Sequence, residues 1–369
     1  MSDVAVTQIV SFLVGVISSL AAAGIIASFS PSFRFWCRKN YRIVKTSIRN
    51  AKITRFVNSS NSIGDRTLNV GIILNGTSPY LVDMEEAFIH EAKNLLGNKG
   101  ILIHVERSQG THNSNKARNS KVINELFSKF SNSKPDIVVT FGSGVSTYIR
   151  KYHKDIPQIF VGVTDPIASE LCNSLDSDTA RGDVCGVTFS ITAVDRIEFL
   201  KTVFPHKRIG FVYNPKYLAD IHHLKNFREE MIKNNWNFTE ISIDKPQIQS
   251  SVFETVDVLI GWLFFHENIA TFISSCNKPI VGGGWVDLRK GACCCIADDE
   301  EEIGKIASHI LYDYIVNQVS LCQMPIQMPK SAKSRLNIGF NFDAAARYNI
   351  SFSQEIISSA KFLIKENKN

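Results

Sequence analysis

The fold is constrained most by a regular alternation between short apolar runs and longer segments of helical pattern, which begins at Leu68. Strands are expected at 68–74, 101–107, 136–142 and 158–163, and helices at 80–96, 116–130, 145–153 and 166–171. Such alternation is typical of βαβ units, in which helices cover both faces of a parallel sheet. The sequence therefore predicts an α/β fold.

A second series of the same kind follows. Strands are expected at 208–214, 238–243, 256–262 and 278–284, and helices at 217–234, 266–275 and 298–317. We therefore predict two Rossmann-like lobes with parallel sheets, one of residues 68–187 with 298–322 and one of 188–297 with 323–369. The connecting residues Val187–Ile191 are candidate hinges. Because open α/β sheets bind ligands at the carboxyl ends of their strands, a ligand is expected between the lobes.

The N-terminal segment has the pattern of a membrane anchor. Ile9–Phe29 is a run of 21 residues without a charge, close to the roughly 20 residues that a helix needs to cross the hydrocarbon core. Eight basic residues and no acid follow between Arg34 and Arg55. The positive-inside rule then predicts a single-pass protein of the cell membrane, with an anchor at 1–30, a basic linker at 31–67 and cytoplasmic lobes. The alternatives are an atypical signal peptide and an extracytoplasmic orientation.

The net positive charge of the chain comes from this N-terminal part. Residues 1–66 contain nine basic residues and two acids, which gives them a net charge of +7. Because the whole chain has a net charge of +6, the remaining residues sum to −1. A nearly neutral globular part argues against a face that binds nucleic acid.

Cysteine usage indicates buried thiols. Three of the eight cysteines are consecutive, Cys293–Cys295, and no C-x-x-C pair occurs. Neighbouring residues of a strand point to opposite faces, so this run by itself cannot form a tetrahedral metal site. We expect a buried strand with reduced thiols, which fits a reducing compartment, and we expect neither a metal nor a cofactor.

Several expected strand ends are followed by small polar residues that could bind a ligand. They are Asn75, Ser78, Ser143, Gly144, Thr164, Asp165 and Asn214. Backbone N–H groups and short side chains at helix starts are suited to a carboxylate or phosphate, although the same residue types also serve only as helix caps.

Aromatic side chains fall at or just beyond the same strand ends and could stack on a ligand. Tyr80, Tyr213, Trp262 and Trp285 are candidates, together with Gly283, whereas Phe264 and Phe265 are expected in the core. His222 and His223 lie in a polar helical pattern and are expected to be exposed.

Signatures of catalysis are missing from the sequence. The glycine-rich nucleotide motifs, the serine-hydrolase G-x-S-x-G and the zinc-protease H-E-x-x-H do not occur. Asp176 and Asp178 are similar to the metal-binding D-x-D of some two-lobed glycosyltransferases, but a solvated loop is the alternative. No catalytic residue is assigned, and the protein is not expected to be an enzyme.

Four segments carry a resemblance to a known family. They are Val163–Pro166, Gly182–Val187, Lys207–Pro215 and Leu336–Ile350. In order and spacing they resemble the ABC-transporter substrate-binding proteins of the type I periplasmic-binding-protein class, the group that includes tryptophan-type uptake binders.

The resemblance implies two lobes that close on a small solute, such as an amino acid, with site residues Ser143, Gly144, Thr164, Asp165, Tyr213 and Asn214. It also implies an ABC permease as partner. The anchor and the segment WLFFHENIA, which starts at Trp262, depart from the family pattern. A cytoplasm-facing sensor that signals to a partner protein and a glycosyltransferase-like enzyme are the alternative functions.

Overall fold

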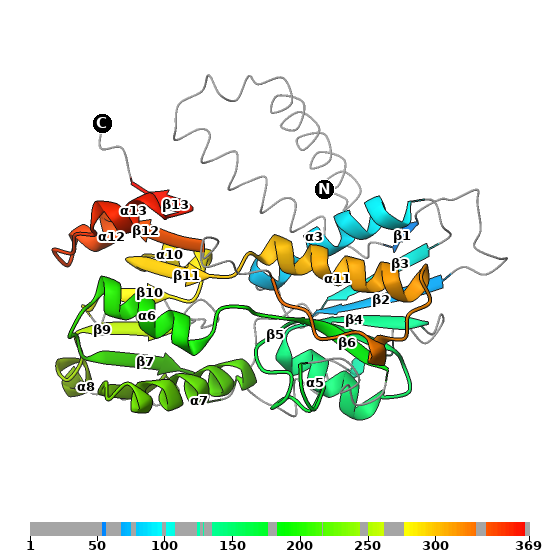
Figure 1. The fold of residues 1–369 in the computed structure, drawn as a ribbon, viewed down its shortest axis with the longest axis horizontal. Helices are drawn as coiled ribbons and strands as arrows, with labels where there is room; N and C mark the ends of the chain where they lie inside the picture. The colour runs from blue at the N-terminus through cyan, green and yellow to red at the C-terminus, as the bar shows by residue number, and fades with distance from the viewer. Residues whose placement is uncertain are drawn as a thin grey trace, which may run out of the picture. The chain divides into compact units, whose positions relative to one another are not determined.

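A computed structural model describes most of the chain beyond residue 67 (Figure 1). The described residues are 54–56, 68–74, 79–97, 101–107, 124–125, 128, 135–175, 183–215, 217–243, 250–261, 277–329 and 337–365. Within these ranges no helix is both long and apolar enough to cross a membrane. The predicted anchor, Ile9–Phe29, lies outside the described residues and stays a prediction.

The first lobe is built on a six-stranded sheet in the order β1-β3-β2-β4-β5-β6. Its strands are β1 (Thr54–Phe56), β2 (Leu68–Leu74), β3 (Ile101–Arg107), β4 (Ile137–Phe141), β5 (Gln158–Val163) and β6 (Val184–Thr188). The pairs β2–β3, β2–β4, β4–β5 and β5–β6 are all parallel. The predicted parallel α/β architecture is therefore confirmed for this lobe.

Helices cover both faces of this sheet. Helices α3 (Pro79–Leu96) and α11 (Glu300–Ile315) lie side by side on one face, and α5 (Ser143–Tyr152) lies on the other (Figure 1). Strand residues alternate between the two cores, so that Ile72 packs toward α3 and α11 while Ile73 packs toward α5.

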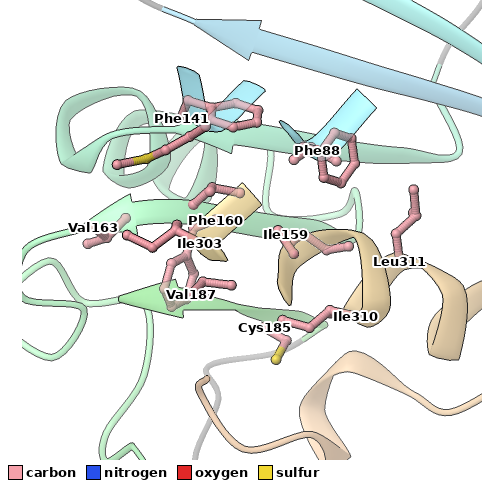
Figure 2. Close-up of a cluster of buried hydrophobic side chains, with 14 of the residues drawn as sticks. Phe88, Phe141, Ile159, Phe160, Val163, Cys185, Val187, Ile303, Ile310 and Leu311 are labelled. Atoms are coloured by element: carbon pink, nitrogen blue, oxygen red, sulfur yellow. The ribbon is translucent and has the colours of Figure 1, made fainter. Parts of the chain in front are cut away.

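The larger core is rich in aromatic and branched side chains. Figure 2 shows Phe88 of α3 and Phe141 of β4 on the same side of the sheet as Ile303 and Leu311 of α11. The Phe88 and Phe141 rings meet edge to face, with centroids 6.1 Å apart. Gly304 of α11 leaves no room for a side chain, because an added Cβ would contact the carbonyl oxygen of Met84. Helix α11 therefore packs into the first lobe although it follows the second lobe in sequence.

The second lobe is built on a seven-stranded sheet in the order β13-β12-β11-β10-β9-β7-β8. Its strands are β7 (Ile209–Tyr213), β8 (Phe238–Ser242), β9 (Val258–Gly261), β10 (Ile280–Gly282), β11 (Cys294–Ala297), β12 (Asn337–Asn341) and β13 (Phe362–Ile364). Its helices are α6 (Ala193–Val203), α7 (Leu218–Lys233), α8 (Ser250–Glu254), α10 (Trp285–Arg289), α12 (Phe342–Ala346) and α13 (Gln354–Ser358), and the 3-10 turn η3 (Leu321–Gln323) lies beside β6 of the first lobe. The sheet is parallel except that β12 runs antiparallel to β11.

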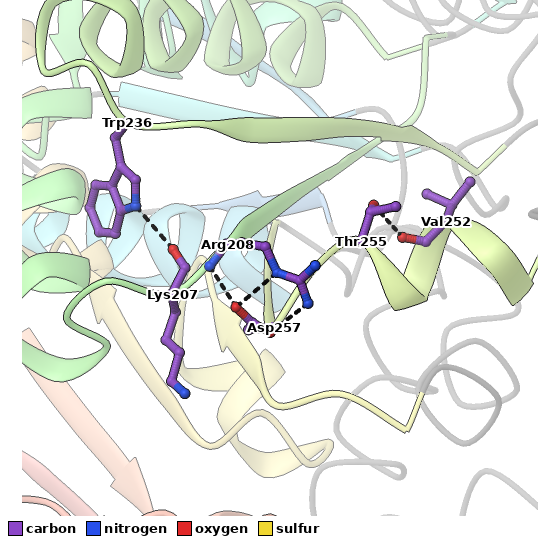
Figure 3. A network of polar contacts seen from close by, with 6 residues as sticks. All are labelled: Lys207, Arg208, Trp236, Val252, Thr255 and Asp257. Atoms are coloured by element: carbon purple, nitrogen blue, oxygen red, sulfur yellow. Dashed lines mark hydrogen bonds and ion pairs between the residues drawn. The ribbon is translucent and has the colours of Figure 1, made fainter.

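Polar contacts hold the amino ends of the second lobe's strands, opposite the edge where ligand loops are expected (Figure 3). Arg208, just before β7, forms a two-pronged ion pair with Asp257, just before β9, with an N–O distance of 2.9 Å. The guanidinium lowers the pKa of Asp257 to about 2. The indole N–H of Trp236 donates to the Lys207 carbonyl oxygen at 3.0 Å.

Two of the segments that connect the lobes are tied to each other. The Asp298 carboxylate accepts hydrogen bonds from the Ser190 backbone N–H at 3.0 Å, from the Ser190 hydroxyl, and from the Ile191 backbone N–H at 3.2 Å. The predicted hinge Val187–Ile191 is thus joined to the chain just before α11. The neighbouring Asp299 caps α11 by accepting from the N–H groups of Glu301 and Glu302, which confirms the predicted helix start.

Some expectations about individual elements were wrong. Residues 166–171 form a turn instead of a helix, closed by Ser169 N–H to Asp165 O at 2.9 Å. Glu170 has a φ of 57°, a left-handed conformation that ends helical geometry after one turn. Helix α6 was not predicted, although Thr192 and Asp195 form a capping box at its start.

Other expectations were not tested. The expected helix at 266–275 and most of that at 116–130 lie outside the described residues. The residue bounds predicted for the two lobes also stay a prediction.

Candidate functional site

Two predicted site residues of the first lobe meet at the carboxyl ends of β4 and β5. The Thr164 backbone N–H donates to the Ser143 hydroxyl oxygen at 3.1 Å, although 21 residues separate them in sequence. The contact arises because parallel neighbouring strands end at the same edge of the sheet. Ser143 is buried and Thr164 half-buried, so both lie at the border between the core and this edge.

The N-terminus of α5 lies at the same edge and carries no side-chain cap. Its N-cap residue, Gly142, has a φ of 89°, a conformation that favours glycine, and has no side chain that could accept from the first N–H groups. Gly144 is exposed, and a Cβ added there would have no heavy atom within 4 Å. Uncapped N–H groups beside open space are suited to an anionic ligand group.

Asp165 has a local structural role in this loop. Its carboxylate accepts the Ala168 backbone N–H at 2.8 Å and so closes the turn that begins at Pro166. The Thr164–Pro166 segment therefore starts a turn. The Asp165 side chain is used within that turn, whereas the Thr164 side chain extends toward the second lobe.

A histidine of the second lobe approaches Thr164. His223 Nε2 of α7 lies 3.4 Å from Thr164 Oγ1. Burial, with the nearby Arg196 as a second cause, holds the pKa of His223 well below its usual range, so the imidazole is neutral near pH 7. The neighbouring His222 is only 6% exposed. The expectation that both histidines are exposed was wrong, because α7 turns this face toward the first lobe.

A second contact between the lobes involves a predicted tyrosine. The Tyr80 hydroxyl, in the first turn of α3, donates to Asp287 Oδ2 of α10 at 3.2 Å, and both side chains are buried. The same oxygen accepts the backbone N–H of Gly283 at 2.8 Å. Burial, and then the Asp287 charge, raise the pKa of Tyr80 well above its usual range, so the phenol stays protonated and is the donor.

The predicted residues after β7 lie next to a buried acid. The Asn214 backbone N–H donates to Asp220 Oδ2 at 2.8 Å, and Tyr213 is half-buried against the core of the lobe. Burial raises the pKa of Asp220 to about 7. Arg196 of α6 is also buried and donates to the Ile296 carbonyl oxygen at 2.9 Å, and burial lowers its pKa to about 10.

Trp285 takes part in packing within the second lobe. Its ring lies edge-on to Phe362 of β13 and close to Gly339 of β12. Asn75, Ser78 and Trp262 lie outside the described residues, as do Phe264, Phe265, Asp176 and Asp178.

Sequence reasoning missed three buried polar residues near this edge, Arg196, Asp220 and Asp287, and the half-buried His223. The acid at position 287, two residues into the helix that follows Gly282–Gly284, was a usable signal, because glycine-rich strand ends often carry ligand groups. His223 was interpreted as an exposed residue of a polar helix, and no role was predicted for Arg196 or Asp220.

The cysteine run is a buried strand, as predicted. Cys294 and Cys295 belong to β11, and Cys293 precedes it with no exposed surface. Burial raises the pKa of Cys293 to about 11 and that of Cys294 well above its usual range. Among the residues described, no three His, Cys, Asp or Glu side chains are grouped to hold a metal ion.

Known proteins share this architecture. Over 81% of the chain and the whole of the other chain, it is similar to an ABC domain in complex with L-Trp from Streptococcus pneumonia (TM-score 0.69, 15% identity). It is also similar over 81% to the ligand-free, open structure of a substrate-binding protein with adhesive properties from Clostridium difficile (TM-score 0.61, 19% identity). These likenesses define the class of fold, the two α/β lobes of type I periplasmic binding proteins.

Sequence comparison gives the family. Residues 93–364 match the family described as "ABC transporter substrate binding protein". A tyrosine-binding protein from Clostridioides difficile (strain R20291) is 26% identical over 200 residues, which are 52% of this chain and 57% of that protein. The chain thus spans little more than half the length of this relative. It belongs to the ABC transporter substrate-binding protein family, whose members are solute-binding proteins.

Proposed function

We propose that the chain binds a small organic solute that carries a carboxylate, such as an amino acid, between its two lobes and without catalysis. The observation that carries the proposal is that Thr164 contacts both Ser143 of the first lobe and His223 of the second. The relatives support an amino acid, since one is named a tyrosine-binding protein and another was solved with L-Trp.

Hydrogen-bond direction favours an acceptor group on the ligand. The Ser143 oxygen already accepts the Thr164 N–H, and within the described residues its own hydrogen has no other partner. A serine hydroxyl has one hydrogen, which is therefore available to a ligand oxygen. Together with the uncapped N-terminus of α5, this arrangement suits a carboxylate.

Closure of the lobes would follow from a difference in the affinity of the solute for the open and the closed conformation. A solute that contacts both lobes binds the closed form more tightly than the open one and shifts the population toward it. No chemical step is needed for this role, and we assign no catalytic residue.

A comparison of matched ligands tests the carboxylate. The full chain is titrated by calorimetry with L-tryptophan and L-tyrosine, and with tryptamine and tyramine, which lack the carboxylate. Binding of the amino acids alone supports the proposal. Equal binding of the amines contradicts it.

Matched variants test the site. Thr164→Ala is expected to weaken binding about tenfold, because a hydrogen-bonding group at a desolvated site is lost. Thr202→Ala is the control, since Thr202 is exposed on α6 and its hydroxyl donates only to the Glu198 carbonyl oxygen. Equal affinity of Thr164→Ala and the control would place the ligand elsewhere.

We further propose that the lobes face the cytoplasm, with Ile9–Phe29 as the anchor. Support comes from the basic residues between Arg34 and Arg55 and from the predominance of buried thiols. In this orientation the chain would be a sensor that signals to a partner protein. The opposite orientation would fit delivery of the solute to an ABC permease. C-terminal fusions distinguish the two, one reporter active only in the cytoplasm and one active only after export.

A further inference from the structure

A chain of buried polar groups lies beneath α5 in an otherwise apolar core. Gln158 of β5 donates through Nε2 to Thr140 Oγ1 at 2.9 Å and to the Ser146 carbonyl oxygen at 3.0 Å. Thr140 Oγ1 of β4 lies 2.9 Å from Ser146 Oγ of α5. All three side chains are at most 1% exposed, and their neighbours on this face include Val138 and Ile149.

The direction of each hydrogen bond follows from a count of hydrogens. The Ser146 hydroxyl donates its single hydrogen to the Gly142 carbonyl oxygen at 2.8 Å, so toward Thr140 it can only accept. Thr140 therefore donates to Ser146, and its own oxygen accepts from Gln158. The Gln158 amide nitrogen donates one hydrogen to Thr140 and the other to the Ser146 carbonyl oxygen, which can only accept. The chain runs in one direction, from Gln158 to Gly142.

Gly142 is the residue that sets the start of α5. Its carbonyl oxygen accepts from the Ser146 hydroxyl at 2.8 Å and from the Ser146 backbone N–H at 3.2 Å, and its own N–H donates to the Val161 carbonyl oxygen at 2.8 Å. Its φ of 89° is adopted readily by glycine, which also leaves the turn without a side chain to stiffen it. The conformation that presents Ser143 and Gly144 therefore depends on these two anchors.

The stability of the fold alone does not explain why a glutamine occupies position 158. Its Oε1 atom is buried and has no partner among the described residues. An unpartnered buried oxygen is unfavourable, and an apolar residue at position 158 would remove it while the Thr140 hydroxyl keeps its hydrogen bond to Ser146. An apolar residue would thus suit this core at least as well.

We propose that Gln158 and Thr140 are positioning residues for ligand binding, which act through Ser146 and Gly142 to hold the N-terminus of α5 toward the ligand. The proposal rests on the proposed function, since the group that α5 receives is the ligand carboxylate. Neither residue touches the ligand itself.

Two substitutions separate positioning from packing. Gln158→Met keeps the volume and removes the two donors, so stability is expected to be unchanged or higher while affinity for L-tryptophan or L-tyrosine falls about tenfold. Thr140→Val keeps the shape and removes the hydroxyl, and the same loss of affinity is expected. Thr140→Ser restores the hydroxyl at a loss of packing, so it is expected to bind like the wild type although it is less stable.

Calorimetry on the full chain gives the affinities, and hydrogen exchange of the amides of residues 143–146 reads the α5 terminus without any ligand. We expect faster exchange in Gln158→Met and Thr140→Val than in the wild type and Thr140→Ser. If neither amino acid binds the wild type, exchange still decides the positioning claim while the proposed function fails. The proposal is overturned if amide exchange in Gln158→Met and Thr140→Val is the same as in the wild type. It is also overturned if Gln158→Met keeps the wild-type affinity, or if Thr140→Ser loses as much affinity as Thr140→Val.

Discussion

The hydroxyl of Tyr80 and the carboxylate of Asp287 join the two lobes through one buried hydrogen bond of 3.2 Å, across 207 residues of sequence. The tyrosine lies in the first turn of α3 and the aspartate lies in α10, so each residue stands at the carboxyl edge of its own sheet. This bond links the lobes and adds to the contact between Thr164 and His223.

Tyr80→Phe is therefore expected to loosen the ligand-free lobes. Removal of a hydrogen bond to a buried carboxylate should shift the ratio of open to closed molecules about tenfold toward the open form. Distances between spin labels on non-natural amino acids at the exposed positions Lys154 and Lys207 measure this shift, since buried cysteines rule out thiol labelling.

Tyr152→Phe serves as the control for that experiment. Tyr152 is 56% exposed at the end of α5 and loses the same hydroxyl far from the lobe contact. A distance distribution for Tyr80→Phe that matches this control would show that the bond does not hold the lobes together.

Gly304→Ala is expected to destabilise the first lobe by about 1–3 kcal/mol. An added Cβ would lie 2.9 Å from Ala87 Cβ and from the Phe88 nitrogen, so α11 could not stay at its present distance from α3. Urea unfolding measures the change, with Lys305→Ala at an exposed position of the same helix as the control. Equal stability of the two variants would mean that the helices are not closely packed.

The contribution of Glu300 to the stability of the wild type is expected to fall as pH rises from about 4.5 to about 8. Burial, with the nearby charge of Asp83, raises the pKa of Glu300 from 4.5 to about 8. Between these values the folded state holds a proton that the unfolded state has lost, so stability decreases with rising pH. Glu300→Gln removes this titration and should flatten the profile.

Thermal unfolding at several pH values tests this expectation. The exposed neighbour Glu301 provides the matched control, because Glu301→Gln makes the same change at a solvated position of the same helix. A wild-type profile that coincides with that of Glu300→Gln would contradict a buried, proton-binding carboxyl at position 300.

The cysteine strand is expected to be unreactive in the folded protein. Cys294 and Cys295 are fully buried, and their thiol pKa values are raised by burial, so little thiolate forms at pH 8. Alkylation with iodoacetamide followed by mass spectrometry should modify both only after denaturation, with half-buried Cys322 as the internal comparison. Rapid modification of Cys294 in the native chain would disprove the buried strand.

The sequence was informative where local pattern determines structure. Apolar runs such as LNVGIIL are buried on both faces and can only be central strands, which is why β2 was predicted with its full bounds. Because parallel strands end at one edge, Ser143 and Thr164 could be predicted as neighbours in general terms.

Contacts that depend on the docking of distant elements could not be predicted. The pairing of Tyr80 with Asp287 and the contact of His223 with Thr164 require both lobes in place, and polar residues of α7 look like a solvated face until that happens. The turn at 166–171 was also missed, since its end depends on the left-handed conformation of Glu170, a residue type that rarely adopts it.

The distance between labels at Lys154 and Lys207 of the full chain, with and without saturating L-tryptophan or L-tyrosine, tests the central claim most directly. Solute binding between the lobes predicts that an amino acid removes the long-distance population and leaves one short distance, while tryptamine and tyramine have no effect. A distribution that no amino acid changes would contradict an account in which this chain closes on an amino-acid solute.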